Sequence, residues 1–486
     1  MSIQVFLQGR LRGIEEFLLA PAHASESGTA GPCGEALLIG RTHWVTLLGE
    51  VLPRALLAEL GLAPMLLGFS GGGRFLVVLP EEARARAEEF LDLAQADIAA
   101  LSGDHLRLTW AITENLGEWS IVRRRLAEVF RQNRNSAWSA RMPEALNAFP
   151  SAMPDTGDYF PRQMGVDLRE ARAVGWSPQT PGRILLSGGK HTWPLGAYAD
   201  SLPVLHHAAL DDDSNGAADL PTLARRADGT PAWGVLRGDV DDFAIRLRRL
   251  DSIEENVQLS VFYKHFFAGE LEVVCSMPEF WRKVTVLHTG GDNFAVCGAW
   301  DALLPLAREI ERLFRQFAGE KLGELPGAEG KTISMAAVIA QDVDTPLAAV
   351  YREAGRRLEI AKSTGKDCID VFGRTVEWKQ LARAAELKEN MLRLIREFGC
   401  SRQFLGELGG FYRDRAAAGE STRFDRPWRY HRRFNRVVGR VSDREFQKLR
   451  FSLITELIGR NPTQVNLRPA GRVAVAWARQ LTGNEV

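Results

Sequence analysis

The segment VTVLHTGGDNFAVCGAW, residues 284–300, constrains the fold more than any other stretch of this chain. Two apolar runs flank Gly290-Gly291-Asp292-Asn293, which predicts a β-hairpin with these four residues at its tip. Asn tolerates the positive φ of a tight turn, so a purely structural connection is one interpretation. A Mg²⁺ site would instead use carboxylates at such a tip. The segments on either side of the hairpin help to decide between a structural turn and a metal site.

Strands and helices alternate on both sides of this hairpin. In chain order, the strand WGVLRGDV, the helices FAIRLRRL and ENVQLSVFYKHFFAGEL, the hairpin, the helix DALLPLAREIERLFRQFAGE, the strand ISMAAVIAQ, the helix PLAAVYREAGRRLEIAKS and the strand CIDVFG are predicted. We describe this unit, residues 231–378, by the order β-α-α-β-β-α-β. That order is typical of a ferredoxin-like antiparallel sheet with helices on one face.

The N-terminal part of the chain echoes this unit. Residues 1–145 also have an early strand, a long helix and a glycine-rich hairpin, here around Gly71-Gly72-Gly73. The echo predicts two related sheet domains facing each other. Prolines and the run DDDSNG mark residues 146–230 as a loop-rich connector, and residues 379–486 are predicted to be helical. The predicted fold class is therefore α+β, with two ferredoxin-like domains, an irregular connector and a C-terminal helical domain.

Length and charge limit the functional classes. A chain of 486 residues is too long for one core. Because Lys plus Arg (61) equals Asp plus Glu (61), contact with nucleic acid must be local or made by partner subunits. The five cysteines are far apart without a C-x-x-C pair, so we expect neither zinc nor disulfides. With no membrane-spanning apolar run, a cytoplasmic protein is expected.

Carboxylates are predicted to meet at one edge of the second sheet. Asp239 ends the first strand of this unit, and in the predicted layout that strand lies beside the hairpin that carries Asp292. Two converging carboxylates make a hard-oxygen site for Mg²⁺ or Mn²⁺, which can support phosphoryl transfer. Gly290 and Gly291 would let a triphosphate approach the backbone closely. Lys362 would neutralise phosphate charge.

Several segments together resemble one family. WGVLRGDVDDFAIRL, QLSVFYKHFFAGEL, VLHTGGDNFAVCGAWDALLPLAREIERLF and LEIAKSTGKDCIDVFGRTVEW closely resemble the second palm domain of the large signature subunit of type III CRISPR–Cas effector complexes, in its III-A (Csm-type) form. LQGRLRGIEEFLLA, GRTHWVTLLGEVLPRALLAELGLAP and GFSGGGRFLVVLP resemble the first palm domain of that subunit. RPWRYHRRFNRVVGR resembles part of its C-terminal domain. The resemblance covers nearly the whole chain except the connector.

The resemblance implies a function in antiviral defence. Members of the family assemble with backbone, small and guide-handle-binding subunits, CRISPR RNA and target RNA, and their second palm condenses ATP into cyclic oligoadenylates. By resemblance, Asp239 and Asp292 are catalytic metal ligands for Mg²⁺ or Mn²⁺, and Gly290 and Gly291 line the triphosphate. Ser260 stands where the family approaches the nucleotide base.

The chain departs from the family at three places. The first palm begins near Met1 and the sequence lacks a His-Asp dipeptide, so we expect no N-terminal HD nuclease domain. The connector lacks the cysteines of the family's usual zinc site. The family's Gly-Gly-Asp-Asp reads Gly-Gly-Asp-Asn here, so Asn293 is a degenerate metal position whose lost charge weakens cation binding by several kcal/mol before desolvation offsets it. Asp242, where the family usually has Asn, is a possible compensation.

Three functions remain open at this point. The first is a structural and signalling subunit of an RNA-guided complex whose polymerase site is weak or inactive. The second is an active cyclic-oligoadenylate synthetase that uses ATP and a divalent metal. The third is a stand-alone enzyme resembling a diguanylate cyclase, against which the paired palms and the helical tail argue.

Overall fold

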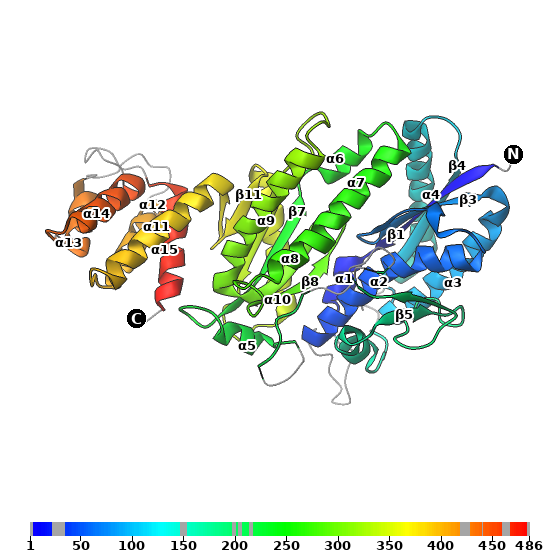
Figure 1. Ribbon diagram of the computed structural model, residues 1–486, viewed down its shortest axis with the longest axis horizontal. Helices are drawn as coiled ribbons and strands as arrows, with labels where there is room; N and C mark the ends of the chain where they lie inside the picture. The colour runs from blue at the N-terminus through cyan, green and yellow to red at the C-terminus, as the bar shows by residue number, and fades with distance from the viewer. Residues whose placement is uncertain are drawn as a thin grey trace.

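The computed structural model describes residues 3–21, 35–145, 153–196, 201–202, 207–212, 217–417, 428–439, 441–458 and 467–483. Figure 1 shows an elongated arrangement with the N-terminal sheet at one end, a second sheet in the middle and a group of C-terminal helices at the other end. The α+β class predicted from the sequence is confirmed.

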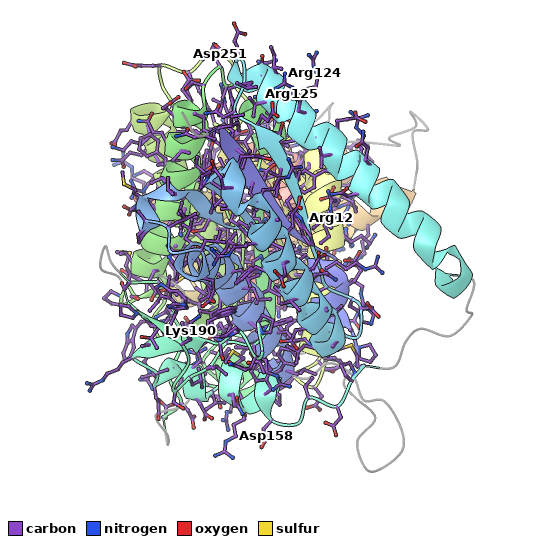
Figure 2. All side chains as sticks on the ribbon, turned by 90° about the vertical axis from the view of Figure 1, so that its right-hand side faces the viewer. Arg12, Arg124, Arg125, Asp158, Lys190 and Asp251 are labelled. Carbon is purple, nitrogen blue, oxygen red and sulfur yellow. The ribbon has the colours of Figure 1, made fainter. Side chains whose placement is uncertain are left out.

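The first sheet has four antiparallel strands in the order β2-β3-β1-β4. The strands are β1 (Gln4–Arg12), β2 (Leu67–Gly71), β3 (Arg74–Pro80) and β4 (Arg107–Glu114). The helices are α1 (Ile14–Leu19), α2 (Glu35–Glu59), α3 (Arg84–Ser102) and α4 (Trp119–Ala145). Because strand side chains alternate, Leu7 packs with α2 and α3, whereas Phe6 packs with α4. Figure 2 shows α4 running out beyond the rest of this unit.

The second sheet has six strands in the order β12-β11-β10-β7-β9-β8. The strands are β7 (Trp233–Val240), β8 (Val284–Thr289), β9 (Asn293–Ala299), β10 (Ile333–Ile339), β11 (Cys368–Val371) and β12 (Arg374–Glu377). The helices are α6 (Phe243–Arg248), α7 (Ile253–His265), α8 (Leu271–Cys275), α9 (Trp300–Lys321) and α10 (Leu347–Thr364). The central strand is β7, which pairs with both β9 and β10.

The second sheet differs from the predicted layout in one respect. β10 and β11 are parallel, so a crossover helix, α10, must join them. α10 lies on the opposite face from α9: its Ala354 shares a core with Val235, whereas Leu236 shares a core with α9. The sheet is therefore mixed, and helices cover both of its faces. Compared with the β-α-α-β-β-α-β order, it has the additional helix α10 and the additional parallel strand β11. Helix α2 of the first unit packs on the same face as α10.

The connector is irregular but packed. Its elements are a π-helical turn (Tyr159–Met164), β5 (Ala173–Trp176), β6 (His191–Pro194) and α5 (Leu220–Arg225). The turn lies against α2, where His43 Nδ1 is 2.8 Å from the carbonyl oxygen of Met164. At the other end, the backbone N–H of Val286 in β8 donates to the carbonyl of His207 at 2.9 Å. The connector thus ties the two sheet units together.

Helices follow the second sheet to the end of the described chain. They are α11 (Trp378–Arg396), α12 (Gln403–Ala417), α13 (Trp428–Val438), α14 (Arg444–Leu457) and α15 (Pro469–Thr482). Their apolar faces extend the core that begins under α9. Within the described ranges, no helix combines the length and apolar character needed to cross a bilayer.

Candidate functional site

Two glycine-rich hairpin tips, one from each sheet, meet at the centre of the molecule. A Cβ atom built on Gly72, between β2 and β3, would lie only 2.6 Å from the backbone nitrogen of Gly291, between β8 and β9. Gly72 also has a φ of 58°, in the left-handed region. Only glycine permits this approach of two backbones. The contact brings the GGDN tip against the first sheet unit.

The carboxylates of Asp239 and Asp292 lie near each other beside this contact. Asp239 is the register partner of Asn293 across β7 and β9, and the N–H of Val240 donates to the carbonyl of Asp292 at 2.8 Å. Lys362, near the end of α10, bonds Asp239 with 2.6 Å between Nζ and Oδ1. The structure therefore brings together three of the predicted site residues, Asp239, Asp292 and Lys362.

Both carboxyl groups have raised pKa values. Burial, and then repulsion by Asp292, raises the pKa of Asp239 to about 6, although Lys362 acts in the opposite direction. Burial also raises the pKa of Asp292, against the attraction of Arg74 and Lys362. Two half-buried acids that repel each other are suited to binding a cation.

Asn293 is held by the residues around it. Its Oδ1 lies 3.0 Å from His288 Nε2, and its Nδ2 donates to Asp292 Oδ1 at 3.2 Å. Burial lowers the pKa of His288 to about 4, so the imidazole is neutral near pH 7. The Asn293 amide therefore presents its N–H group to Asp292, where a carboxylate would present an oxygen. In the described part of the chain, no group of three or more His, Cys, Asp or Glu side chains is arranged to hold a metal.

The other acids of the DVDD run are bonded elsewhere. Asp241 accepts hydrogen bonds from the hydroxyls of Ser334 and Thr332, each at 2.8 Å, and from the N–H of Asp367 at 2.9 Å. β7 ends at Val240, so Asp241 lies beyond the strand that carries Asp239.

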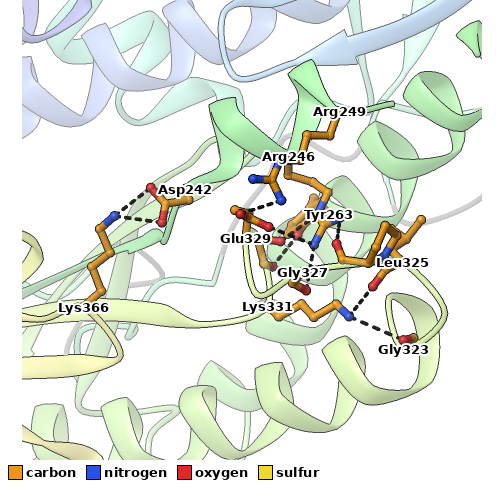
Figure 3. Close-up of polar contacts among 12 residues, drawn as sticks. Asp242, Arg246, Arg249, Tyr263, Gly323, Leu325, Gly327, Glu329, Lys331 and Lys366 are labelled. Carbon is orange, nitrogen blue, oxygen red and sulfur yellow. Dashed lines mark hydrogen bonds and ion pairs between the residues drawn. The ribbon is translucent and has the colours of Figure 1, made fainter. Parts of the chain in front are cut away.

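Asp242 is also engaged away from the hairpin tip. It pairs with Lys366 Nζ, at 2.7 Å and 2.8 Å to its two carboxylate oxygens, as Figure 3 shows. The same view shows Arg246 of α6 bonded to the loop that precedes β10, including the carbonyl of Glu329 at 2.7 Å. These contacts position the start of α6. In this arrangement, Asp242 does not take the place of the carboxylate missing at Asn293.

Two cavities lie on either side of the hairpin contact. One of about 580 Å³ is lined by Asp239, Gly290 and Asn293, and also by α2 and α10. The other, of about 720 Å³, is lined by Gly291 and Ser260, and also by β1, β3 and α4. Ser260 therefore faces a different cavity from Asp239, although both cavities reach the same hairpin tip.

Sequence reasoning missed two arginines beside the site, Arg74 of the first sheet unit and Arg237 of the second. Arg74 of β3 is the leading cation acting on Asp292, yet the two stand more than two hundred positions apart. Arg237 lies in the first cavity, where it bonds Glu15 at 3.0 Å and stacks over Tyr351. Only the apposition of the two units reveals these roles, because Glu15 and Asp292 each come from the other unit.

A protein-family model matches the second sheet unit. Residues 232–370 match the model for Cas10/Cmr2, second palm domain. A Thermococcus onnurineus protein described as "CRISPR system single-strand-specific deoxyribonuclease Cas10/Csm1 (subtype III-A)" is 24% identical over 450 residues, covering 76% of this chain and 55% of the relative. A Mycobacterium tuberculosis protein of the same description is 27% identical over 179 residues, covering 32% of this chain and 21% of the relative. The chain thus spans about half the length of the first relative.

Solved structures share the fold. A Csm1–Csm4 cassette in complex with cA3 superimposes with a TM-score of 0.70 at 18% identity, covering 98% of this chain and 70% of that one. The cassette in complex with one ATP gives 0.69 at 18% identity, with the same coverage. Csm1 of T. onnurineus gives 0.67 at 17% identity, covering 99% of this chain and 70% of that one.

Proposed function

We propose that this chain, as a member of the Cas10/Csm1 family of type III-A CRISPR large subunits, is a subunit of an RNA-guided antiviral complex. In this proposal the second palm binds nucleotide but makes little cyclic oligoadenylate. The observation that carries the proposal is the pair Asp239 and Asp292 at a glycine hairpin, with Asn293 turning an N–H group toward Asp292.

The proposed partners are the backbone, small and guide-handle-binding subunits, together with CRISPR RNA and target RNA. The likeness to the Csm1 chain of a solved Csm1–Csm4 subcomplex supports a Csm4-like subunit as a neighbour. The balance of 61 basic and 61 acidic residues supports RNA contact through partners and local patches.

We expect the tagged chain, expressed with its neighbouring subunits, to co-purify with them and with RNA of guide length. The check is affinity purification followed by sequencing of the bound RNA. Recovery of the chain alone, together with synthesis of a cyclic dinucleotide from GTP, would instead favour the stand-alone cyclase.

A divalent cation fits the acidic pair. Asp239 and Asp292 supply hard oxygen ligands, and their mutual repulsion is relieved by a cation. Asn293 adds no ligand in the observed arrangement, because His288 occupies its oxygen. When bound, Mg²⁺ or Mn²⁺ polarises phosphate oxygens and stabilises the charge that develops in phosphoryl transfer.

The residues around the pair have separable roles in this proposal. Gly290 and Gly291 leave the backbone open for close approach of a triphosphate. Lys362 holds Asp239 in place and supplies positive charge beside the phosphates. Ser260 contributes from the second cavity, where the base of a nucleotide would lie against α7.

We expect the complex with target RNA, ATP and Mn²⁺ to form cyclic oligoadenylate weakly or not at all. The reason is that the neutral amide of Asn293 does not supply a third carboxylate beside those of Asp239 and Asp292. Product can be measured by liquid chromatography and mass spectrometry, beside an equally assembled complex whose large subunit carries Gly-Gly-Asp-Asp. Abundant product, formed at the rate of the Gly-Gly-Asp-Asp complex, would instead establish the active synthetase, which the retained Asp239, Asp292 and Lys362 favour.

We expect Mn²⁺ affinity to increase from about pH 5 to about pH 7, because a proton competes with the metal for Asp239, whose pKa is about 6. The folding stability of the metal-free chain changes with pH in the opposite sense to the Mn²⁺ affinity. The folded carboxyl keeps its proton to higher pH than the ordinary 3.8, so stability falls as pH rises from that value to about 6. Titration of free Mn²⁺ by electron paramagnetic resonance tests this. A pH-independent affinity, equal to that of Asp239→Asn, would contradict it.

A further inference from the structure

A line of hydrogen bonds runs from α10 to the carboxylate of Asp292. The side-chain oxygen of Asn293 can only accept, so Nε2 of the neutral His288 ring, which lies 3.0 Å from it, carries the ring proton. Nδ1 of the same ring is then an acceptor, and the hydroxyl of Tyr351 lies 3.4 Å from it. Asn293 in turn donates from Nδ2 to Asp292 at 3.2 Å. Each group therefore donates to the next, from Tyr351 through His288 and Asn293 to Asp292.

The far end of this line is held by an arginine and by the first sheet unit. The guanidinium carbon of Arg237 lies 4.3 Å from the centre of the Tyr351 ring, whose face attracts the cation. Nη1 of Arg237 also donates to the carbonyl of Tyr351 at 3.3 Å and bonds Glu15 of α1 at 3.0 Å. Tyr351 is therefore held through its ring and its backbone, and its hydroxyl stays beside His288.

Two glycines leave space at the ends of this line. A Cβ atom on Gly290 would lie 2.6 Å from Oδ1 of Asn293, so the amide packs directly on the bare backbone of the hairpin tip. A Cβ atom on Gly355, inside α10, would lie 2.4 Å from Nη1 of Arg237 and 3.3 Å from Oε1 of Glu15. Glycine inside a helix lowers stability relative to alanine, and here a larger residue would displace the Arg237–Glu15 pair.

The observed orientation keeps the side-chain oxygen of Asn293 away from the acidic pair. An asparagine binds a divalent ion through that oxygen, because the amide nitrogen is a donor only. Here the oxygen accepts from His288, and the N–H group that faces Asp292 would repel a cation. Tyr351, His288, Asn293 and Asp239 all line the cavity of about 580 Å³, so the amide has open space in which to turn over.

We propose that His288 and Tyr351 are positioning residues that lock the Asn293 amide in its metal-free orientation, and that breaking this lock makes Asn293 a neutral oxygen ligand beside Asp239 and Asp292. The inference rests on the proposed function, because it takes the acidic pair to be the cation site. It adds a second cause for weak cation binding. Besides lacking a charge, Asn293 is bonded to a partner that directs its N–H group, and not its oxygen, toward the acids.

The test is the Mn²⁺ affinity of the purified full chain at one fixed neutral pH, measured by electron paramagnetic resonance of the free ion. His288→Leu removes the donor to Asn293 and should raise the affinity about fivefold, the factor that corresponds to one ordinary hydrogen bond. His288→Gln is the matched control: its amide N–H still donates to Asn293, so the affinity should stay near that of the natural chain. Tyr351→Phe keeps the ring beside Arg237 and removes only the hydroxyl, so it should raise the affinity by a smaller factor.

Two double variants show whether His288 acts through Asn293. In an Asn293→Ala background, His288→Leu should no longer change the Mn²⁺ affinity, because the amide that it would release is absent. In an Asp239→Asn background, the gain should also disappear, which would place the added binding at the acidic pair. A purely structural role of His288 would instead lower the affinity, or give a gain that persists without Asn293.

An affinity that is unchanged or lower in His288→Leu and Tyr351→Phe would overturn the proposal, provided that thermal unfolding shows both chains to be folded. If His288→Leu does not fold, Tyr351→Phe decides alone, since it removes a single oxygen atom. Failure of the acidic site would appear separately, as Mn²⁺ binding by the natural chain that Asp239→Asn leaves intact. Failure of the proposed weak synthesis would appear in the assembled complex, as oligoadenylate made at the rate of the Gly-Gly-Asp-Asp complex.

Discussion

Replacing Asn293 by Asp is expected to raise Mn²⁺-dependent oligoadenylate synthesis by the assembled complex at least about tenfold. The new carboxylate would face Asp239 across the strand pair and stand next to Asp292. Two unit charges at about 4 Å attract by roughly 4 kcal/mol at an effective dielectric of about 20, and about 1.4 kcal/mol net is sufficient for a tenfold gain. His288 Nε2, 3.0 Å from Oδ1 of Asn293, would occupy only one of the two carboxylate oxygens.

Two further measurements separate metal binding from catalysis. Asn293→Asp should be less stable than the natural chain without metal, because three acids then repel one another, and should gain more thermal stability when Mn²⁺ is added. Asn293→Ala is the matched control: it removes the amide without adding charge, so it should gain neither metal affinity nor product. A variant Asn293→Asp with unchanged Mn²⁺ affinity and unchanged synthesis would show that the amide does not limit this site.

Glu50→Gln is expected to weaken the packing of the two sheet units by about 2–3 kcal/mol, somewhat less than the roughly 3–5 kcal/mol that breaking a fully buried ion pair costs. Glu50 of α2 is only 4% exposed, and its oxygens bond Lys264 at 2.6 Å, Ser70 at 2.7 Å and Arg54 at 2.9 Å. Lys264 belongs to α7 of the second unit, so the network joins the two units. The lower value is appropriate because Lys264 and Arg54 are each 24% exposed.

Native-state hydrogen exchange of α7 measures this effect, since protection there reports opening of the contact with α2. Glu353→Gln is the control, because Glu353, like Glu50, pairs with two cations, here Arg356 and Arg357, but at the surface; its cost should stay below about 1 kcal/mol. Despite burial, Lys264 and Arg54 lower the pKa of Glu50. The contribution of Glu50 is therefore present above the ordinary carboxyl pKa and is lost as pH falls through the lowered value. Equal exchange in the two variants would refute the role of Glu50.

Much of the second sheet unit could be predicted from local sequence. The hairpin of β8 and β9, the strand that ends near Asp239 and the helix that carries Lys362 each follow from the spacing of apolar residues and from glycines in turns. Such patterns arise because a strand or a helix must turn one set of side chains toward a core. The family resemblance rested on the same segments.

The limits of local sequence are visible within a single short run, DVDD. Asp239, Asp241 and Asp242 are nearly adjacent, yet they bond to Lys362, to Ser334 and Thr332, and to Lys366 respectively. No local pattern distinguishes them, because each partner is brought in by a different crossover of the chain. The parallel pairing of β10 with β11, and hence the position of α10, belongs to the same class of long-range decision.

The type and order of the secondary structure and the presence of acids at a glycine hairpin follow from the sequence, since these features depend on neighbouring residues. The packing of the folded chain sets two other features: Asn293, bonded to His288, turns its N–H toward Asp292, and Arg74 approaches from the other sheet unit. The physical reason is that electrostatic and hydrogen-bonding partners are selected by distance in space, which two packed sheets set independently of distance along the chain.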